Sequence, residues 1–456
     1  MNLPIDYKKE IEKILKNEEE YEKFIKCYNE PSFKGIRINT LKISEERFKE
    51  IFKFKIKKSN FSKNNYYLEE NIDSIGNLPL HHAGAFYVQE PSASSAVTVL
   101  NPVPGEKVLD LCAAPGGKST QIAESLNGNG LLWSNEIVKN RAQVLLSNIE
   151  RMGVRNAVVS SCHPEVLCEK LTGFFDKVLV DAPCSGEGMF RKNPRAIEDW
   201  SQEHVKMCAK RQLSILNTAA KVLKEGGIMV YSTCTFSLEE NEQTVYNFLK
   251  ENTDFTLENI NCGFGRASQQ LNLGKNLIDT SKARRIFPQD GGEGHFVAKF
   301  RRKSANSKKV KDFNYKRAKI ADNKLGYDYF STLFSCEAYG KIEKFSDNFI
   351  ILPEGLPDIS GLNVLRAGVL LATSKGSVLE PAHAVFMAAK AEDLRSKIDF
   401  SCDSKEILAY LKGEEISVQE EIRSYVGVCV DGIVTGYAKA VNGRLKNKYP
   451  KGLRIF

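Results

Sequence analysis

Between residues 100 and 300, five short apolar runs alternate with stretches of helical periodicity. The runs are VLDL at 108–111, LLWSNE at 131–136, AVVSS at 157–161, KVLVDA at 177–182 and GIMVYS at 227–232. Continuous apolar strands separated by helices are typical of a parallel sheet covered by helices on both faces. We expect a long helix before the last run, from near Asp199 to Gly226–Gly227. The fold class predicted is therefore α/β, with a mostly parallel sheet.

The flanking regions have a different pattern. The first 60 residues indicate a helix, with Ile11, Ile14, Leu15, Phe24 and Ile25 at helical spacing, and a short alternating strand at 35–39. The last 130 residues end in strand-like pieces, YVGVCV and GIVTGYAKAV. A chain of 456 residues has room for two to four domains. We divide it into an α+β extension (1–95), the sheet domain (96–302), a linker (303–325) and a C-terminal region that ends in a mainly β unit (326–456).

The positive charge of the chain is concentrated in one segment. Residues 299–324 hold eleven basic and two acidic residues, a net charge of +9, whereas the whole chain carries +8. This composition favours a basic linker between two folded regions.

The eleven cysteines include no Cys-x-x-Cys pair, which argues against a zinc ribbon. The N-terminus is charged throughout, and no apolar run approaches the roughly 18 residues that span a bilayer. We expect a cytoplasmic protein with reduced thiols, no metal and no membrane partner. A cysteine in a special position is then a candidate for chemistry.

The first such position is the segment CAAPGGKS at 112–119, which follows the first strand and opens a helix. Glycines there let the backbone approach a ligand, and the helix N-terminus offers free N–H groups. The P-loop pattern fails because its first glycine is absent. Glu136 ends the next strand, 19 residues after Gly117, where a carboxylate can hold ribose hydroxyls. The pair indicates a nucleoside-containing cofactor; the alternative is a helix cap and a surface acid.

Two cysteines follow later strands. DAPCSG places Asp181 and Cys184 after the fourth run, and YSTCT places Cys234 after the fifth. Because ligands bind at the carboxyl ends of parallel strands, we expect both cysteines to face one crevice. The alternative is that each is a small apolar side chain in the core.

CAAPGGKS, DAPCSG and YSTCT, in this order, resemble the S-adenosylmethionine-dependent RNA cytosine-5 methyltransferases of the Sun family. HHAGAFYVQEPSA at 81–93 and RIFPQDGGEGHFVAKF at 285–300 resemble the segments that open and close the catalytic domain of that family. The tail GYAKAVNGRLKNKYPKGLR is similar to the PUA-like domain of the bacterial RsmF branch. The resemblance implies a Rossmann-like methyltransferase core between an N-terminal RNA-binding extension and a C-terminal PUA-like RNA-binding domain.

The resemblance also implies roles for residues. Cys234 is the expected nucleophile that adds to cytosine C6, Cys184 is assigned to product release, and Asp181 to the cytosine edge or the cofactor. Where many relatives carry an acid near the adenine, this chain has His163, for which an ordinary polar turn residue is the alternative. The expected binding residues for S-adenosyl-L-methionine are Cys112, Ala113, Ala114, Pro115, Gly116, Gly117, Lys118, Glu136, His163 and Asp181.

The expected macromolecular partner is ribosomal RNA. The resemblance favours small-subunit RNA, within a subunit or its precursor, over large-subunit or transfer RNA, and a monomeric enzyme. The tail from 439 to 454 is basic without any acid, although a solvated basic tail is the simpler interpretation. The expected RNA-binding residues are Arg37, Asn39, Lys439, Arg444, Lys446, Lys448 and Lys451.

Three other functions are considered. A DNA cytosine methyltransferase carries its nucleophile after the fourth strand and does not explain Cys234. A catalytically silent assembly factor for ribosomal RNA does not need two cysteines and Asp181. A nicotinamide-dependent oxidoreductase fits the glycine turn and Glu136 but gives the two cysteines no task.

Overall fold

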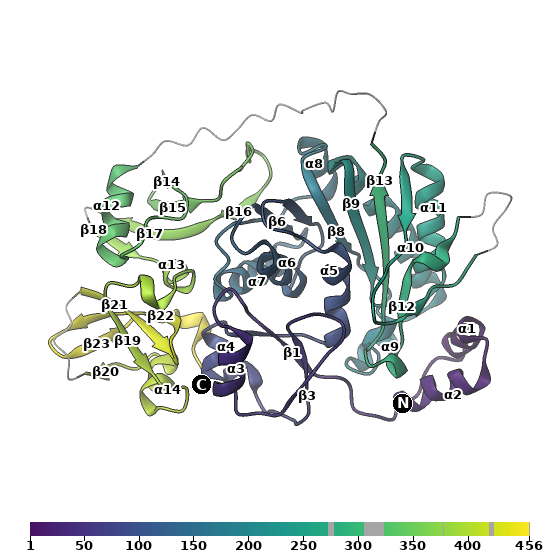
Figure 1. The fold of residues 1–456 in the computed structure, drawn as a ribbon, viewed down its shortest axis with the longest axis horizontal. Helices are drawn as coiled ribbons and strands as arrows, with labels where there is room; N and C mark the ends of the chain where they lie inside the picture. The colour runs from purple at the N-terminus through teal and green to yellow at the C-terminus, as the bar shows by residue number, and fades with distance from the viewer. Residues whose placement is uncertain (272–277, 305–322, 377, 419–423, 456) are drawn as a thin grey trace.

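The computed structural model describes residues 1–271, 278–304, 323–376, 378–418 and 424–455. The N-terminal extension holds four α-helices and a small four-stranded antiparallel sheet of order β2-β3-β1-β4 (Figure 1). Its elements are α1 (Ile5–Leu15), α2 (Glu18–Cys27), β1 (Gly35–Ile38), α3 (Glu45–Ile51), β2 (Ile56–Lys58), β3 (Asn65–Leu68), η1 (Ile75–Asn77), α4 (Pro79–His82) and β4 (Phe86–Val88).

A large mixed sheet forms the centre of the molecule. Five strands run parallel in the order β7-β6-β5-β8-β9, and β13 continues the sheet antiparallel to β9. The first half of this domain contains η2 (Pro91–Ser94), α5 (Ser95–Leu100), β5 (Lys107–Asp110), α6 (Gly117–Leu126), β6 (Leu131–Asn135), α7 (Lys139–Arg151), β7 (Ala157–Ser160), α8 (Pro164–Lys170) and β8 (Phe175–Asp181). The second half contains η3 (Glu187–Met189), α9 (Pro194–Glu198), α10 (Gln202–Val222), β9 (Leu223–Thr233), η4 (Glu239–Gln243), α11 (Thr244–Glu251), β10 (Phe255–Glu258), β11 (Arg266–Ala267), η5 (Thr280–Lys282), β12 (Arg284–Ile286), η6 (Pro288–Asp290) and β13 (His295–Arg302).

All five apolar runs are strands of this sheet, and the predicted α/β fold class is confirmed. Successive residues of one strand point to opposite faces of the sheet and pack in different hydrophobic cores. Val108 packs in the core covered by α5, α6 and α7, whereas Leu109 packs in the core covered by α8, α10 and α11. Burial on both faces explains why the runs are continuously apolar. The chain leaves the sheet at β7 and returns at β8 beside β5, so a topological switch point lies between β5 and β8.

Two details differ from the sequence-based expectations. The long helix ends at Val222, because Leu223 already pairs with Phe175 of β8; the strand then bulges through Gly226, whose φ is +76°. The single N-terminal helix is two helices, α1 and α2. Lys16 adopts a left-handed conformation and the Asn17 side chain accepts the Glu20 N–H, which starts a new helix.

The C-terminal region is mainly β. It contains α12 (Lys324–Leu333), β14 (Lys341–Phe345), β15 (Asn348–Leu352), β16 (Val364–Ala367), β17 (Val369–Lys375), β18 (Val378–Pro381), α13 (His383–Met387), η7 (Ala391–Asp393), β19 (Lys397–Phe400), α14 (Lys405–Lys412), β20 (Ile416–Ser417), β21 (Ser424–Val430), β22 (Ile433–Val441), β23 (Arg444–Asn447) and η8 (Lys451–Leu453). The predicted strand-like pieces YVGVCV and GIVTGYAKAV are β21 and β22. Strand β16 pairs with β7, so this region extends the central sheet.

The two ends of the chain also share a core. Ile36 and Phe86 of the extension pack in one apolar cluster with Tyr410, Val428 and other residues of the C-terminal domain. The Tyr449 hydroxyl lies 2.7 Å from His82 Nδ1, and the C-terminus lies beside α3 and α4 (Figure 1). The extension and the last domain therefore form one packed unit.

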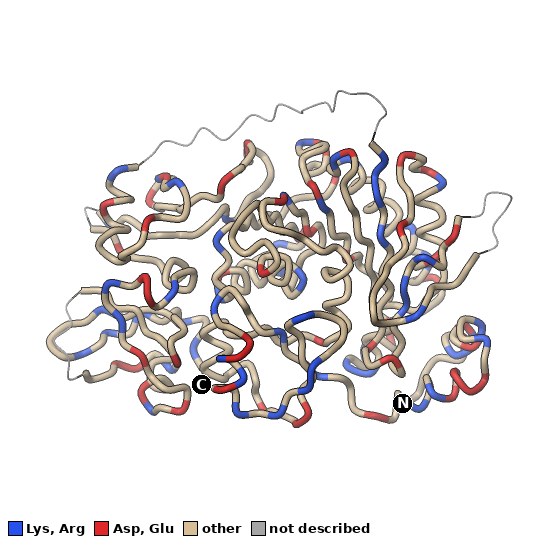
Figure 2. The backbone as a smooth tube through the Cα atoms, in the orientation of Figure 1, with Lys and Arg blue, Asp and Glu red and all other residues tan. Residues whose placement is uncertain are grey.

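Charged residues of both signs are interleaved over the described backbone (Figure 2). Three residues of the basic segment belong to β13, where Lys299 and Arg301 pair with Glu258, and Arg302 pairs with Asp254. The remainder of the predicted linker, from 305 to 322, lies outside the described residues. Among the described residues, no helix is long and apolar enough to cross a bilayer, and no cluster of three acidic, histidine or cysteine side chains could hold a metal ion.

Candidate active site

The structure brings Cys184 and Cys234 together. Cys184 follows the end of β8 and Cys234 follows the end of β9, and their Sγ atoms lie 3.3 Å apart. The Cys234 N–H also points to the Cys184 sulfur at 3.4 Å. Contact with Cys234, together with burial, raises the pKa of the Cys184 thiol well above its usual range. Cys184 therefore keeps its proton, and its thiol is placed to donate toward the Cys234 sulfur.

Two adjoining cavities lie at the carboxyl ends of the strands. One of about 220 Å³ is lined by Cys234 and will be called the catalytic cavity. The other, of about 240 Å³, is lined by the turn after β5 and will be called the cofactor cavity. Four residues line both: Glu90, Ala93, Lys118 and Asp181. The shared wall means that groups bound in the two cavities approach each other beside Asp181.

Asp181 and Lys118 form an ion pair on this shared wall. Lys118 Nζ lies 2.8 Å from Asp181 Oδ2, and the Ser232 hydroxyl donates to Oδ1 at 2.6 Å. Burial opposes the charge on both groups, yet the ion pair raises the pKa of Lys118 and lowers the pKa of Asp181. Both groups are therefore charged at neutral pH. The carboxylate is held in place to accept a hydrogen bond from a ligand.

The turn predicted to hold the cofactor lines the cofactor cavity. Gly117 is the first residue of α6. A Cβ atom there would approach the Tyr87 ring to 3.2 Å, so glycine keeps the space between this turn and Tyr87 free in the cofactor cavity. Gly116 has φ +115° and stands next to the turn without lining the cavity. The predicted cofactor residues that line the cavity are Cys112, Ala113, Ala114, Pro115, Gly117, Lys118 and Asp181.

Besides Gly116, two predicted cofactor residues, Glu136 and His163, lie outside this lining. The Glu136 side chain is only 4% exposed; its carboxylate accepts the Val138 N–H at 3.0 Å and pairs with Arg141 at 3.2 Å. Glu136 directly follows β6, and the next two residues, Ile137 and Val138, are exposed. His163 precedes α8 with its side chain 56% exposed, and its Nδ1 lies 3.9 Å from Glu165. His163 thus does not point into the cofactor cavity in this structure.

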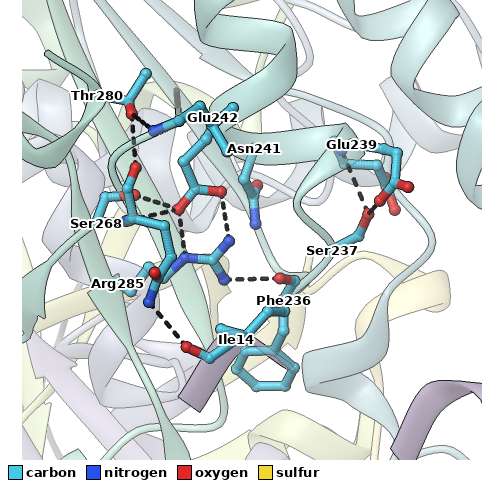
Figure 3. A network of polar contacts seen from close by, with 12 residues as sticks. Ile14, Phe236, Ser237, Glu239, Asn241, Glu242, Ser268, Thr280 and Arg285 are labelled. Carbon is cyan, nitrogen blue, oxygen red and sulfur yellow. Dashed lines mark hydrogen bonds and ion pairs between the residues drawn. The ribbon is translucent and has the colours of Figure 1, made fainter. Parts of the chain in front are cut away.

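A buried polar network fixes the loop after Cys234 (Figure 3). Arg285 of β12 forms an ion pair with Glu242 and donates from Nη1 to the Phe236 carbonyl at 2.7 Å. The Ser268 hydroxyl donates to the same Glu242 carboxylate. Phe236 also packs against Phe24 of α2. The N-terminal helices and the edge of the sheet thereby hold the segment that carries the nucleophile candidate.

The structure adds cavity residues that sequence analysis did not assign. The catalytic cavity is also lined by Lys192, Glu293 and His295. Burial lowers the pKa of Lys192, and it lowers that of His295 to about 4, which keeps the imidazole neutral at pH 7. Glu293 and His295 belong to the segment 285–300, which was singled out as a motif. The motif at 285–300 was therefore visible in the sequence. The sequence did not show which residues of the motif line the cavity and which pack in the core.

Arg37 and Asn39, two of the predicted RNA-binding residues, are completely buried and present no surface to RNA in this structure. Arg37 donates to the Gly117 carbonyl at 3.0 Å and to the Thr120 hydroxyl at 2.7 Å, and it pairs with Glu124. Asn39 donates to the Met152 carbonyl at 2.9 Å. Both residues hold β1 against the central domain, and Arg37 steadies the start of α6.

The basic residues of the last hairpin share one face. Lys439 of β22 lies directly opposite Lys446 of β23, and Arg444 and Lys448 stand two residues to either side of Lys446. Lys439, Arg444, Lys446 and Lys451 are exposed, whereas Lys448 is half-buried and pairs with Glu380 at 2.7 Å. Like charges opposite each other destabilise a sheet, and the segment from 439 to 454 contains no acidic residue to offset them. Tyr449 is buried in the core and is not part of the surface.

The parallel sheet, its glycine turn and the two adjoining cavities define an α/β methyltransferase. Family models match nearly the whole chain: the N-terminal domain of 16S rRNA methyltransferase RsmF at 3–91, 16S rRNA methyltransferase RsmB/F at 97–301, the RsmF rRNA methyltransferase first C-terminal domain at 329–388, and the methyltransferase RsmF PUA domain at 397–455. The chain belongs to the RsmF family of 16S rRNA methyltransferases. The predicted PUA-like domain is confirmed by this match.

Individual relatives support the same family assignment. Ribosomal RNA small subunit methyltransferase F of Vibrio vulnificus is 34% identical, with 99% of this chain and 97% of the relative covered. The protein of the same name from Shewanella halifaxensis is 31% identical over 97% and 96%. A crystal structure of a methyltransferase homologue from Pyrococcus horikoshii is 31% identical, covers 62% of this chain and 91% of its own, and has a TM-score of 0.56. NSun6 from the same organism, at 24% identity and TM-score 0.56 over 66% and 99%, shows the same fold.

Proposed function

We propose that this enzyme transfers a methyl group from S-adenosylmethionine to C5 of a cytosine in small-subunit ribosomal RNA, through a covalent adduct of Cys234. One observation carries the proposal. Cys234 lines the catalytic cavity, Cys184 lies behind it at 3.3 Å, and the cofactor cavity adjoins them across Asp181. The names of the full-length relatives support the RNA class.

The cofactor cavity suits S-adenosylmethionine. Backbone from 112 to 117 and the start of α6 supply N–H groups and close approach, and Glu136 stands at the end of β6, where ribose hydroxyls are held in this fold class. Glu90 and Asp181 add carboxylates to a lining that is rich in small residues from 112 to 117, which favours a cationic sulfonium. S-adenosylmethionine supplies an electrophilic methyl group.

The two cysteines divide the reaction. The Cys234 thiolate forms a bond to C6 of cytosine and breaks the C5–C6 double bond, so that C5 becomes nucleophilic and takes the methyl group. Asp181, held by Lys118, accepts a hydrogen bond from the polar edge of the base and favours the protonated ring that this addition produces. Lys192 brings a second ammonium group to the same cavity.

Release reverses the addition. C5 then carries both a proton and the new methyl group. Removal of that proton returns its electron pair to the C5–C6 bond and expels the Cys234 thiolate. Cys184 is the neighbouring group, with its Sγ atom 3.3 Å from Cys234 Sγ, and as a thiolate it would take up that proton. We assign Cys184 to this step.

We assign RNA binding to the C-terminal domain. The basic face of β22 and β23 offers cations to phosphates, which gives affinity and position without reading sequence. The target base must leave its stack to reach the cavity. Such an enzyme works where ribosomal RNA is assembled, in the bacterial cytoplasm.

The test is methyl transfer from S-adenosylmethionine labelled in the methyl group to small subunits from cells lacking this enzyme. Digestion of the RNA to nucleosides should place the label in 5-methylcytidine. The Cys234→Ala variant should transfer none, whereas Cys336→Ala, which changes a half-buried cysteine remote from the site, should transfer normally. Label in another nucleoside, or in RNA treated with Cys234→Ala, would refute the proposal.

A further inference from the structure

A second hollow lies beside the catalytic cavity and has no role in the chemistry described above. It has a volume of about 800 Å³ and is formed by the segment before β1, by β2, by the end of β3 and by Gly291. We will call it the aromatic groove. Its residues are Pro31, Ser32, Phe33, Lys34, Lys57, Tyr67, Leu68, Glu69, Glu70, Asn71 and Gly291.

Two half-buried rings line the groove. The Phe33 and Tyr67 ring centroids lie 5.8 Å apart with the ring planes inclined by 58°, so the rings form an apolar corner. Lys57 lies opposite Tyr67 on β2, and Gly35 lies opposite Tyr67 on β1. A Cβ at Gly35 would come within 2.6 Å of the Tyr66 carbonyl, so glycine is required there.

A single wall separates the groove from the catalytic cavity. Gly291 lines the groove and accepts the Tyr67 hydroxyl at 2.7 Å, while Glu293, two residues later, lines the catalytic cavity. The Glu293 carboxylate accepts the Phe33 N–H at 2.5 Å and pairs with Arg191 at 3.4 Å. The Arg191 guanidinium in turn lies 5.2 Å from the centre of the Phe33 ring. The groove is therefore a neighbour of the catalytic cavity, with the segment from Gly291 to Glu293 between them.

The charge of the lining indicates what fits. Lys34 and Lys57 are balanced by Glu69 and Glu70, so the groove offers no excess cation for a run of phosphates. Two aromatic rings and polar groups at the edge suit a flat, uncharged heterocycle, and nucleobases stack on such rings with little preference for sequence. Because the groove lies next to the catalytic cavity, the neighbour of the target cytosine in the same strand is the natural occupant.

We propose that the aromatic groove binds, by stacking on Phe33 and Tyr67, the base of an unpaired nucleotide adjacent to the target cytosine. The inference rests on the proposed function, because it requires that the catalytic cavity receive a base from RNA. Its consequence is that two nucleotides are drawn out of the RNA structure, one for chemistry and one to hold the strand against the enzyme.

The experiment combines abasic nucleotides in the RNA with a change in the groove. Full-length enzyme is assayed for kcat/KM on an RNA that contains the target cytosine, with a single abasic residue placed in turn at each position around it. Wild-type enzyme should lose about 10-fold at one adjacent position, the range expected for one stacked base. Phe33→Leu should lose a similar factor on intact RNA and no further factor on the RNA that is abasic at that position. Phe345→Leu, which alters an exposed phenylalanine of β14, is the matched control and should behave as wild type.

Phe33→Trp gives a second readout. Its fluorescence should be quenched by intact RNA and not by the abasic RNA, and this change does not depend on turnover. The proposal would be overturned if the losses in kcat/KM from Phe33→Leu and from the abasic residue were independent and multiplied. It would also be overturned if intact and abasic RNA quenched the tryptophan fluorescence equally. The groove would then bind another partner. If wild-type enzyme transferred no methyl group to cytosine in any RNA, the proposed function would fail first, which distinguishes the two failures.

Discussion

The sulfur atoms of Cys184 and Cys234 lie 3.3 Å apart, although 50 residues separate them in the chain. The contact arises because β8 and β9 are adjacent parallel strands whose carboxyl ends meet at one edge of the sheet. Only Cys234 lines the catalytic cavity. This asymmetry between two neighbouring thiols is the basis for giving them different roles.

Glu136→Ala should weaken S-adenosylmethionine binding. A buried carboxylate that ends β6 supplies charge-assisted hydrogen bonds, and losing it should cost on the order of 1.5–3 kcal/mol. Titration calorimetry of the free enzyme measures this directly. Glu165→Ala removes an exposed acid beside His163 and serves as the control. Equal affinities of wild type and Glu136→Ala would remove Glu136 from the site.

Arg37→Met should destabilise the fold. Removing the guanidinium leaves the Glu124 carboxylate buried without its partner and frees the Gly117 carbonyl, at a cost of about 3–5 kcal/mol. Urea unfolding followed by circular dichroism provides the measurement, and Lys439→Met, at an exposed cation, should leave the midpoint nearly unchanged. Unchanged stability combined with lost RNA affinity would instead support the predicted role of Arg37 as an RNA contact.

Asp110→Asn should change the pH dependence of stability. Burial, reinforced by the charge of Asp181, raises the pKa of Asp110 to about 7, although the Ser119 hydroxyl opposes this. The folded protein therefore holds a proton that the unfolded chain releases near its ordinary pKa, and wild type loses stability as the pH rises from about 4 to about 7. The variant has no proton to lose and should gain roughly 2–4 kcal/mol over wild type across this window, then level off. Parallel stability curves for the two proteins would contradict the shift.

Replacing Lys439, Arg444 and Lys446 together by alanine should weaken RNA binding and flatten its salt dependence. Each lost phosphate contact lowers the slope of log affinity against log salt by roughly 0.7–0.9, so the slope should fall by about 2–3. Affinity for S-adenosylmethionine should not change. An unaltered slope would show that the hairpin is a solvated surface only.

Substitution is preferred here to truncation. The C-terminal region contributes β16 to the central sheet and shares a core with the extension, so its removal would expose apolar residues such as Ile36 and Phe86. Loss of RNA binding by a truncated chain would then report unfolding as much as a lost contact.

Sequence patterns predicted the central sheet well because its strands are buried on both faces and read as uninterrupted apolar runs. They also placed Cys184 and Cys234 at one edge, since the strand ends fix that position. The partnership of β16 with β7 could not be foreseen, because nothing local marks which distant strand completes a sheet edge.

The sequence-based predictions were least accurate for polar residues in and beside short strands. Arg37 and Asn39 alternate with apolar residues as they would on a solvated face, yet they point to partners that lie about 80 and 113 residues further along the chain. Only the folded structure shows that this face is covered. His163 was assigned to the cofactor site by the resemblance alone, and its side chain is 56% exposed in the structure.

The central claim is that Cys234 starts the reaction and Cys184 ends it. The most direct test incubates each alanine variant with S-adenosylmethionine and target RNA, followed by denaturing gel electrophoresis. Cys184→Ala should accumulate a covalent protein–RNA complex that survives denaturation, because the adduct forms and is not released. Cys234→Ala should form none and transfer no methyl group. An adduct with Cys234→Ala and none with Cys184→Ala would contradict the account and exchange the two roles.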